Sequence, residues 1–417
     1  MPVDTALSLI RCEALLRPMP TQMLPLEDAL GRVLANAVHS RMNLPPFDNS
    51  AMDGYALPTD ISDPAPGTEL PVAAEISAGA APAAGAAGAA LAIMTGAALP
   101  PGYHSVVPVE DVEVLGKTAD LRVNRIRLLK STCNGQNRRC AGEDIAIGQT
   151  VLLAGRLLRA TDLPVLRGIG IESLPLRRRP RVAILCTGRE LCAPGTALAE
   201  GQIYDTNGLS LSLLMTAAGA EVVSVTRVVD DPQAFARALD AVCELGVDAV
   251  LSSGAVSMGR YDFIPESLSQ LGATTHFHKL AMRPGKPLLF ATLPTGEMYF
   301  GLPGNPVSSL VGARFFVVAA LRAMLGLPVE TPWQLPLLDA LPRKPALTFF
   351  QKARVLLAEG GQLRVQRLEG QESFRIGPLL QANAWAVFPA EAQSLSAGAL
   401  VPVFPMVPGS TITSIQE

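Results

Sequence analysis

The chain has 417 residues, and its 34 lysines and arginines against 37 aspartates and glutamates give a formal net charge of −3. This length suffices for about three domains whose cores need no disulfide or metal. The near-balance of charge argues against a protein that coats nucleic acid or an anionic membrane. Hydrophobic residues make up 49% and charged residues 17% of the chain, which excludes global disorder.

The six cysteines are scattered without a C-x-x-C pair, so they predict neither a zinc site nor a disulfide framework. No basic and then apolar leader follows Met1, and we therefore expect a cytoplasmic protein. The stretch between Ile76 and Val109 lacks Asp, Glu, Lys and Arg but is rich in glycine, proline and alanine. A lipid-facing helix would lose backbone hydrogen bonds at such residues, so we expect a loop-rich segment and no membrane partner.

The first 178 residues contain three segments of different pattern. Residues 1–46 open with an amphipathic helix for which Asp4 is the expected N-cap, and residues 140–178 contain a short helix near Thr161–Arg167. Residues 47–139 consist of short β segments separated by Pro and Gly, which predicts a β-rich unit.

Strands alternate with helices over residues 179–327, which predicts a parallel or mixed sheet between two helical layers. Asp231 and Asn305 are the expected N-caps of two helices that begin at Pro232 and Pro306. Ligands of such sheets bind beyond the carboxyl ends of the strands. The expected strands are Arg181–Cys186, Glu221–Thr226, Asp248–Leu251 and Met298–Phe300.

Residues 328–417 change to period-two patterning. Leu347–Ala358 and Gln362–Leu368 flank Gly360-Gly361, which is typical of a hairpin, and Val401–Phe404 is the expected closing strand. The sequence therefore predicts a multidomain α/β plus β protein that ends in a small β-barrel-like domain.

Two kinds of turn could hold an anion. The segments Gly254–Asp262 and Gly301–Pro306 each lie between a strand and a helix, where free backbone N–H groups suit anionic groups, although any α/β domain has such turns. Arg283 and Lys286 lie in a proline-stiffened turn that suits a phosphate or another oxyanion. No G-x-G-x-x-G follows a strand and no Walker A motif is present, which disfavours dinucleotide dehydrogenases and P-loop NTPases.

Acidic residues follow the predicted strands at Glu190, Asp230, Asp231 and Asp262. Magnesium uses a few such oxygens beside substrate phosphates. Helix capping explains Asp231 better, and it remains an alternative for Asp262.

The segment Pro46–Ala56, PFDNSAMDGYA, resembles the signature of the molybdopterin molybdenumtransferase family. Further matches follow in the family's order and span essentially the whole chain. They are Met94–Ala97, Gly142–Ile145, Tyr204–Asn207, Ser253-Gly254, Pro284–Pro287 and Gly301–Pro306.

The resemblance implies an elongated homodimer of four-domain subunits, in which residues 1–46 with 140–178 form a dimerisation or linker domain and residues 47–139 form an inserted β-rich domain. Residues 179–327 would be the molybdopterin-binding domain, facing the inserted domain of the other subunit. The implied reaction inserts molybdenum from molybdate into the dithiolene of adenylyl-molybdopterin and releases AMP, with Mg²⁺ as cofactor. Other proteins of molybdenum cofactor synthesis are possible partners.

The resemblance also implies site residues. The expected catalytic residues are Asp53, Thr95, Glu190, Asp230, Asp262 and Lys286, of which Glu190, Asp230 and Asp262 would bind the metal. The expected substrate-binding residues are Ser253, Gly254, Ser257, Arg283, Pro303, Gly304, Asn305 and Pro306.

The chain departs from the family pattern at Arg189 and Arg260, each of which puts a cation where an acid is common. If these side chains faced the site, they could retune its cation binding; solvent-facing side chains are the alternative. Two other functions stay open at this point: a non-catalytic scaffold and the enzyme of the adenylylating step.

Overall fold

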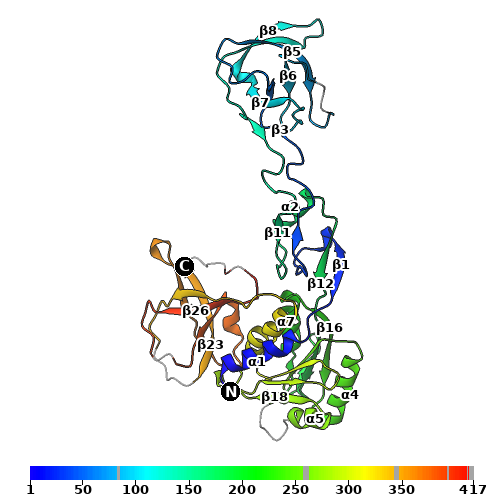
Figure 1. Ribbon diagram of the computed structural model, residues 1–417. Helices are drawn as coiled ribbons and strands as arrows, with labels where there is room; N and C mark the ends of the chain where they lie inside the picture. The colour runs from blue at the N-terminus through cyan, green and yellow to red at the C-terminus, as the bar shows by residue number, and fades with distance from the viewer. Residues whose placement is uncertain (82–84, 257–262, 342–346, 392–393, 411, 413–417) are drawn as a thin grey trace.

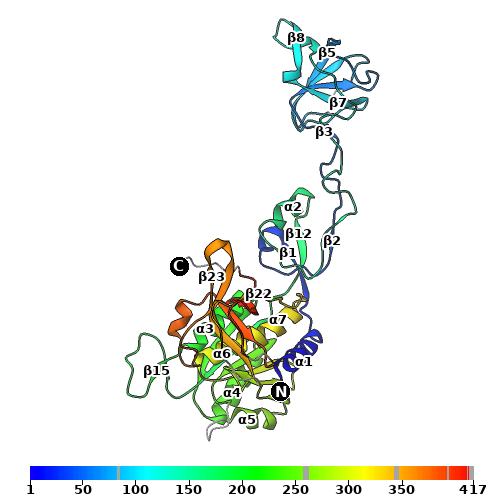
Figure 2. The same ribbon diagram turned by 90° about the vertical axis from the view of Figure 1, so that its left-hand side faces the viewer.

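The computed structural model describes residues 1–81, 85–256, 263–341, 347–391, 394–410 and 412. They form an elongated molecule in which a body of two domains carries a stalk, and the stalk carries a further domain at its far end (Figure 1). The view turned by 90° shows the same separation (Figure 2). The predicted multidomain α/β plus β architecture is therefore confirmed, whereas the exact domain boundaries stay predictions.

A six-stranded mixed sheet forms the centre of the body. Four neighbouring strands are parallel, and β20 is antiparallel to both strands beside it. The strand order is β16 (Glu221–Val228), β13 (Arg181–Thr187), β17 (Ala249–Ser253), β21 (Met298–Leu302), β20 (Leu289–Thr292) and β18 (Thr274–His278). The central strands β17 and β21 are buried along their whole length because helices cover both faces of the sheet.

The helices form one layer on each face, which confirms the three-layer α/β domain. Ile184, Leu251 and Phe300 pack in the core of one face, and Leu185 and Val250 in the core of the other. The first layer contains α1 (Val3–Leu15), α3 (Asn207–Ala217), α6 (Pro306–Gly312) and α7 (Val318–Met324). The second layer contains α4 (Pro232–Cys243) and α5 (Ile264–Gln270).

Helix α1 packs on α7, so it adds to the α/β domain although it precedes the stalk in the sequence. The prediction that Asp4 caps this helix is wrong: the N-cap is Pro2, and Asp4 lies in the first turn. Asp231 does cap α4, since its Oδ1 accepts a hydrogen bond from Ala234 N at 2.7 Å. Asn305 has the predicted N-cap position before α6, but its side chain makes no capping hydrogen bond.

The segment Pro306–Met324 is the only one among the described residues that is long and apolar enough to cross a membrane by length and composition. It is continuous because a π-helical turn, Ala313–Val317, joins α6 to α7. Of its most apolar window, 78% is buried inside the protein. This helix is therefore a core element of the body.

The stalk consists of paired segments from both sides of the inserted domain. Its strand pairs are antiparallel, so the chain leaves the body along one side of the stalk and returns along the other. The pairs are β1 (Thr21–Pro25) with β12 (Ser173–Arg177), β2 (Val38–His39) with β11 (Thr150–Leu152), and β3 (Asn49–Ser50) with β10 (Arg138–Arg139). The short helix α2 (Asp162–Gly168) matches the predicted helix to within a residue.

The domain at the end of the stalk is a six-stranded sheet, as its β-rich sequence predicts. The uncharged stretch from Ile76 to Val109 supplies two of its strands and the loops between them. The strand order is β7 (Tyr103–Pro108), β4 (Gly54–Pro58), β6 (Ala90–Ile93), β5 (Glu69–Ile76), β9 (Val123–Leu128) and β8 (Val112–Lys117).

The C-terminal domain contains the predicted hairpin, β23 (Thr348–Leu357) with β24 (Leu363–Arg367), and its closing strand β26 (Leu400–Pro405). β25 (Ala384–Phe388) and β22 (Trp333–Pro336) complete the sheet, and a bridge between Leu337 and Val365 brings its two ends together as in a barrel. The short strand β19 (Met282–Arg283) of the α/β domain pairs with β23. The C-terminal domain is thereby fixed beside the turn that carries Arg283.

One buried carboxylate stabilises the stalk. Asp162, at the start of α2, is 7% exposed and accepts hydrogen bonds from Arg156 Nη2 at 2.6 Å and Nε at 3.0 Å. It also accepts a bond from Arg159 N at 2.9 Å. The hydrogen bonds from Arg156 are the main reason why the pKa of Asp162 lies below its ordinary value.

We predict that Asp162→Asn lowers the free energy of unfolding of the stalk by about 2 kcal/mol at pH 7, because it removes a buried charge-assisted pair. Because the folded pKa is lowered, this contribution is present above about pH 4 and disappears as the pH falls through the folded pKa. Hydrogen exchange of the α2 and β12 amides at pH 7 and pH 3 measures both effects. The exposed pair Asp120–Arg122 supplies the control Asp120→Asn, which should change little; equal effects of the two variants would contradict the prediction.

Candidate active site

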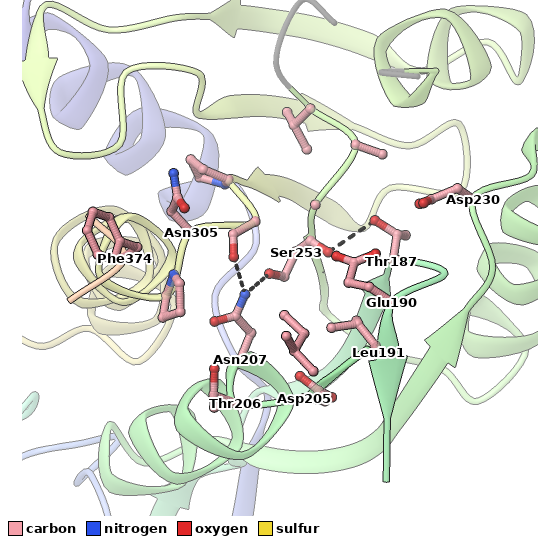
Figure 3. Close-up of a pocket in the computed structure, with 18 of the residues that line it drawn as sticks. Thr187, Glu190, Leu191, Asp205, Thr206, Asn207, Asp230, Ser253, Asn305 and Phe374 are labelled. Atoms are coloured by element: carbon pink, nitrogen blue, oxygen red, sulfur yellow. Dashed lines mark hydrogen bonds between the residues drawn. The ribbon is translucent and has the colours of Figure 1, made fainter. Parts of the chain in front are cut away.

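A cavity of about 620 Å³ opens at the edge of the sheet where β13, β17 and β21 end. This edge is where ligands bind in open α/β sheets. The loops after these strands, the start of α3 and one loop of the C-terminal domain contribute its walls (Figure 3). The residues labelled there include Thr187, Glu190, Asn207, Asp230, Ser253, Asn305 and Phe374.

The side chain of Asn207 joins the loops around this cavity. Its Nδ2 donates to Ser253 Oγ at 2.6 Å and to Gly304 O at 2.8 Å (Figure 3). Thr187 Oγ1 donates to Ser253 O at 3.1 Å. The three strand-end loops and the first turn of α3 therefore hold one another in place, so the cavity is preorganised.

Gly254 lines the first cavity and is the first residue of the predicted anion-binding turn Gly254–Asp262, whose residues 257–262 lie outside the described part of the chain. The N–H of Gly254 is not free for an anion, because it donates to Leu302 O at 3.0 Å. Its φ is +101°, and a Cβ at this position would lie 2.6 Å from Thr187 O and Oγ1. Glycine is required there by close packing between the loops after β13 and β17.

Glu190 and Asp230 line the same cavity, as predicted (Figure 3). Arg189, the residue that departs from the family pattern, turns back onto the loop of Asp230. Its backbone N donates to Asp230 Oδ2 and its Nη2 to Asp230 O, both at 3.3 Å. Arg189 does not line the cavity, so its cation holds the Asp230 loop instead of facing the centre of the site.

A third carboxylate, Asp205, lines the cavity but serves the start of α3. Its Oδ1 accepts a hydrogen bond from Gly208 N at 2.9 Å. Burial, and then the charge of Asp205, raise the pKa of the Cys186 thiol. Cys186 is therefore an inert core residue and not a nucleophile.

Two of the three predicted metal ligands, Glu190 and Asp230, thus lie on one cavity, whereas Asp262, Ser257 and Arg260 lie outside the described residues. Over the ranges that the structure describes, no three His, Cys, Asp or Glu side chains gather into a group that could hold a metal. Magnesium needs only one or two protein carboxylates when substrate phosphates supply other ligands. The pair Glu190 and Asp230 fits that requirement.

The predicted cations lie on a second, adjacent cavity of about 830 Å³. Arg283 and Lys286 line it, and the C-terminal domain adds Arg367, Gln351 and Gln371. Lys286 does not line the first cavity, although its neighbour Pro287 does. The predicted acids and the predicted cations therefore line two neighbouring cavities.

The two cavities share a boundary, and we call the four residues that line both of them the ridge: Pro287, Pro303, Asn305 and Phe374. Of the other predicted residues, Ser253, Gly254, Gly304 and Pro306 line only the first cavity. Sequence reasoning missed Arg367 and Phe374, since no motif marks them and only the docking of the C-terminal domain brings them to the site. Asn207 belongs to the family motif Tyr204–Asn207, but the sequence does not predict that its side chain connects the loops around the cavity.

Asp53 and Thr95 lie together in the inserted domain. Asp53 Oδ1 accepts hydrogen bonds from Thr95 N at 2.7 Å and from Thr95 Oγ1 at 2.9 Å. These bonds, the backbone one above all, lower the pKa of Asp53. Within one chain the pair joins neither cavity, because the inserted domain lies at the opposite end of the stalk (Figure 1).

Three family models match successive parts of the chain. Residues 1–170 match the MoeA N-terminal region (domain I and II), residues 183–323 a probable molybdopterin binding domain, and residues 334–406 the MoeA C-terminal region (domain IV). A molybdopterin biosynthesis moeA protein from Pyrococcus horikoshii OT3 has a similar structure, with a TM-score of 0.79 and 28% identity. The similarity covers 97% of this chain and 99% of that one.

Relatives named molybdopterin molybdenumtransferase are similar over nearly the whole sequence. The protein from Synechococcus elongatus is 35% identical over 407 residues, which cover 96% of this chain and 98% of the relative. The protein from Haemophilus influenzae is 34% identical over 93% of this chain and 94% of its own length. The chain thus belongs to the molybdopterin molybdenumtransferase family.

Proposed function

We propose that this protein is a transferase that inserts molybdenum from molybdate into the dithiolene of adenylyl-molybdopterin and releases AMP. The observation that carries the proposal is the pair of adjacent cavities, one lined by carboxylates and one by cations, that meet at a shared ridge. The reaction needs both environments, because it joins an oxyanion to a substrate whose phosphoanhydride must be cleaved. The full-length relatives are named for this transfer, which favours it over a scaffold or an adenylylating enzyme.

The second cavity would bind the oxyanion. Arg283, Lys286 and Arg367 line it, and its carboxylate Glu372 is already paired with Arg375 at 3.1 Å. The three cations therefore keep their charge available for molybdate or a phosphate. Gln351, on the same walls, accepts a hydrogen bond from Arg367 Nε at its Oε1 at 2.6 Å and so orients that guanidinium.

The first cavity would bind the phosphoanhydride. Glu190 and Asp230 would hold Mg²⁺ there, and Asp262 is proposed as a third ligand. When bound, the ion would neutralise the charge that develops on the phosphates. Ser253 and the backbone around Gly304 and Asn305 would contact the substrate's phosphate, in loops that the Asn207 hydrogen bonds keep in place.

We also propose that the active protein is a homodimer. Asp53 and Thr95 are hydrogen-bonded to each other and exposed, and the stalk separates them from the cavities of their own chain. A role in the reaction therefore requires the site of a second subunit. A cytoplasmic location and contacts with other proteins of cofactor synthesis stay predictions.

Lys286→Ala should raise the molybdate concentration for half-maximal AMP release by at least about tenfold, because it removes a cation from the oxyanion cavity. The assay follows AMP release from adenylyl-molybdopterin with Mg²⁺ while molybdate is titrated. Arg237→Ala, an exposed cation on α4 away from both cavities, is the matched control. A molybdate dependence equal to that of the wild type would contradict the oxyanion role of Lys286.

Glu190→Gln should raise the Mg²⁺ concentration for half-maximal AMP release by about tenfold and leave the molybdate dependence nearly unchanged, since a neutral amide is a poorer ligand for a hard cation. The same assay is run with Mg²⁺ titrated at saturating molybdate. Glu244→Gln, an exposed residue at the end of α4, controls for loss of negative charge. If Glu190→Gln changed the molybdate dependence and not the Mg²⁺ dependence, the assignment of the two cavities would be reversed.

A further inference from the structure

Phe374 is an aromatic side chain exposed at the ridge between the two cavities. It is 63% exposed and lines both of them. In Figure 3 it lies across the first cavity from Glu190 and Asp230. Single exposed apolar side chains are common on protein surfaces, but this aromatic ring lines both polar cavities, and that position points to a contact with a ligand.

The loop that carries Phe374 is fixed to the α/β domain. It connects β24 to the 3₁₀-helix η5 (Gly377–Leu380) of the C-terminal domain. Ser373 O accepts a hydrogen bond from Val307 N, in the first turn of α6, at 3.0 Å. The residue next to Phe374 is therefore anchored to the same helix that follows Pro303 and Asn305.

A buried lysine is hydrogen-bonded to the same loop. Lys352, on β23, is fully buried, and its Nζ donates to Gly370 O at 2.6 Å and to Arg375 O at 2.8 Å. Burial lowers the pKa of Lys352, and the two carbonyl oxygens are acceptors that a buried ammonium group requires. Lys352 thus fixes both ends of the segment that contains Phe374.

The side chain of Gln371 adds a second anchor. Its Oε1 accepts from Lys352 N at 3.0 Å, and its Nε2 donates to Lys352 O at 2.8 Å and Leu368 O at 2.7 Å. The guanidinium of Arg375 lies 5.8 Å from the centre of the Phe374 ring. The ring is therefore presented by a backbone with little freedom, which reduces the entropy lost on binding.

We propose that Phe374 stacks on the planar pterin ring of the substrate and that Lys352 is the positioning residue that presents it. This inference rests on the proposed function and names the residue that recognises the pterin. Stacking between an aromatic side chain and a planar heterocycle needs an exposed ring face, and Phe374 provides one.

The adenine of the substrate is the other planar ring that could stack there. The pterin is favoured because the dithiolene is attached to the pterin system and must meet the oxyanion. Phe374 borders the cavity of Arg283 and Lys286, where that oxyanion would bind, as well as the carboxylate cavity. The adenosine would extend away from the ridge, beyond the phosphoanhydride.

The test compares the affinities of the full-length protein for molybdopterin and for AMP, measured separately under anaerobic conditions. Phe374→Ala should weaken molybdopterin binding by about tenfold, Phe374→Trp should restore it, and AMP binding should not change. Leu380→Ala, which removes a 93% exposed apolar side chain from the same domain, is the control and should bind as the wild type does. Unchanged molybdopterin binding by Phe374→Ala, or a loss confined to AMP, would overturn the proposal.

The positioning role of Lys352 has a separate readout. Lys352→Met should speed cleavage by chymotrypsin after Phe374 in the folded protein. It should also weaken molybdopterin binding about as much as Phe374→Ala does, and the double variant should show no further loss of binding. A cleavage rate equal to that of the wild type would contradict this role. If the wild type shows molybdate-dependent AMP release while both variants bind molybdopterin as the wild type does, only this inference fails. If the wild type neither binds molybdopterin nor releases AMP, the proposed function fails.

Discussion

The site depends on loops after three parallel strands remaining together at one edge of the sheet. The Asn207 amide meets this constraint, because its two hydrogen bonds connect α3 to the loops after β17 and β21. Thr187 adds the loop after β13 through its bond to Ser253 O. Because these polar groups are already paired with one another, the cavity keeps its shape before a ligand arrives. The C-terminal domain then adds one wall through Val307 N and Ser373 O.

The charges of the site are divided between two cavities, and this division has a physical consequence. Opposite unit charges about 4 Å apart attract by about 4 kcal/mol at an effective dielectric constant near 20, so acids and cations in one cavity would neutralise one another. Glu190 and Asp230 line one cavity and Arg283 and Lys286 line the other, with Pro287, Pro303, Asn305 and Phe374 at the shared boundary. Each cavity therefore keeps its charge for a different part of the substrates.

Much of this arrangement could be predicted from the sequence. Alternating strands and helices gave the three-layer domain, and the loops of Glu190, Asp230 and Ser253 were correctly expected at the carboxyl edge of its sheet. The placement of Arg283 and Lys286 beside Arg367 could not be predicted, because it depends on the pairing of β19 with β23, two strands that lie far apart in the sequence. For the same reason no local pattern marked Phe374. Gly254 carried a glycine signal, but its cause is packing against Thr187 and not a free amide.

The location of the oxyanion tests the division of the two cavities most directly. Crystals of the protein soaked with tungstate, an oxyanion nearly identical to molybdate in size and charge, would reveal the metal by its anomalous scattering. We expect an anomalous peak in the cavity of Arg283, Lys286 and Arg367, on the other side of Phe374 from Glu190 and Asp230. A peak confined to the cavity of Glu190 and Asp230 would contradict it.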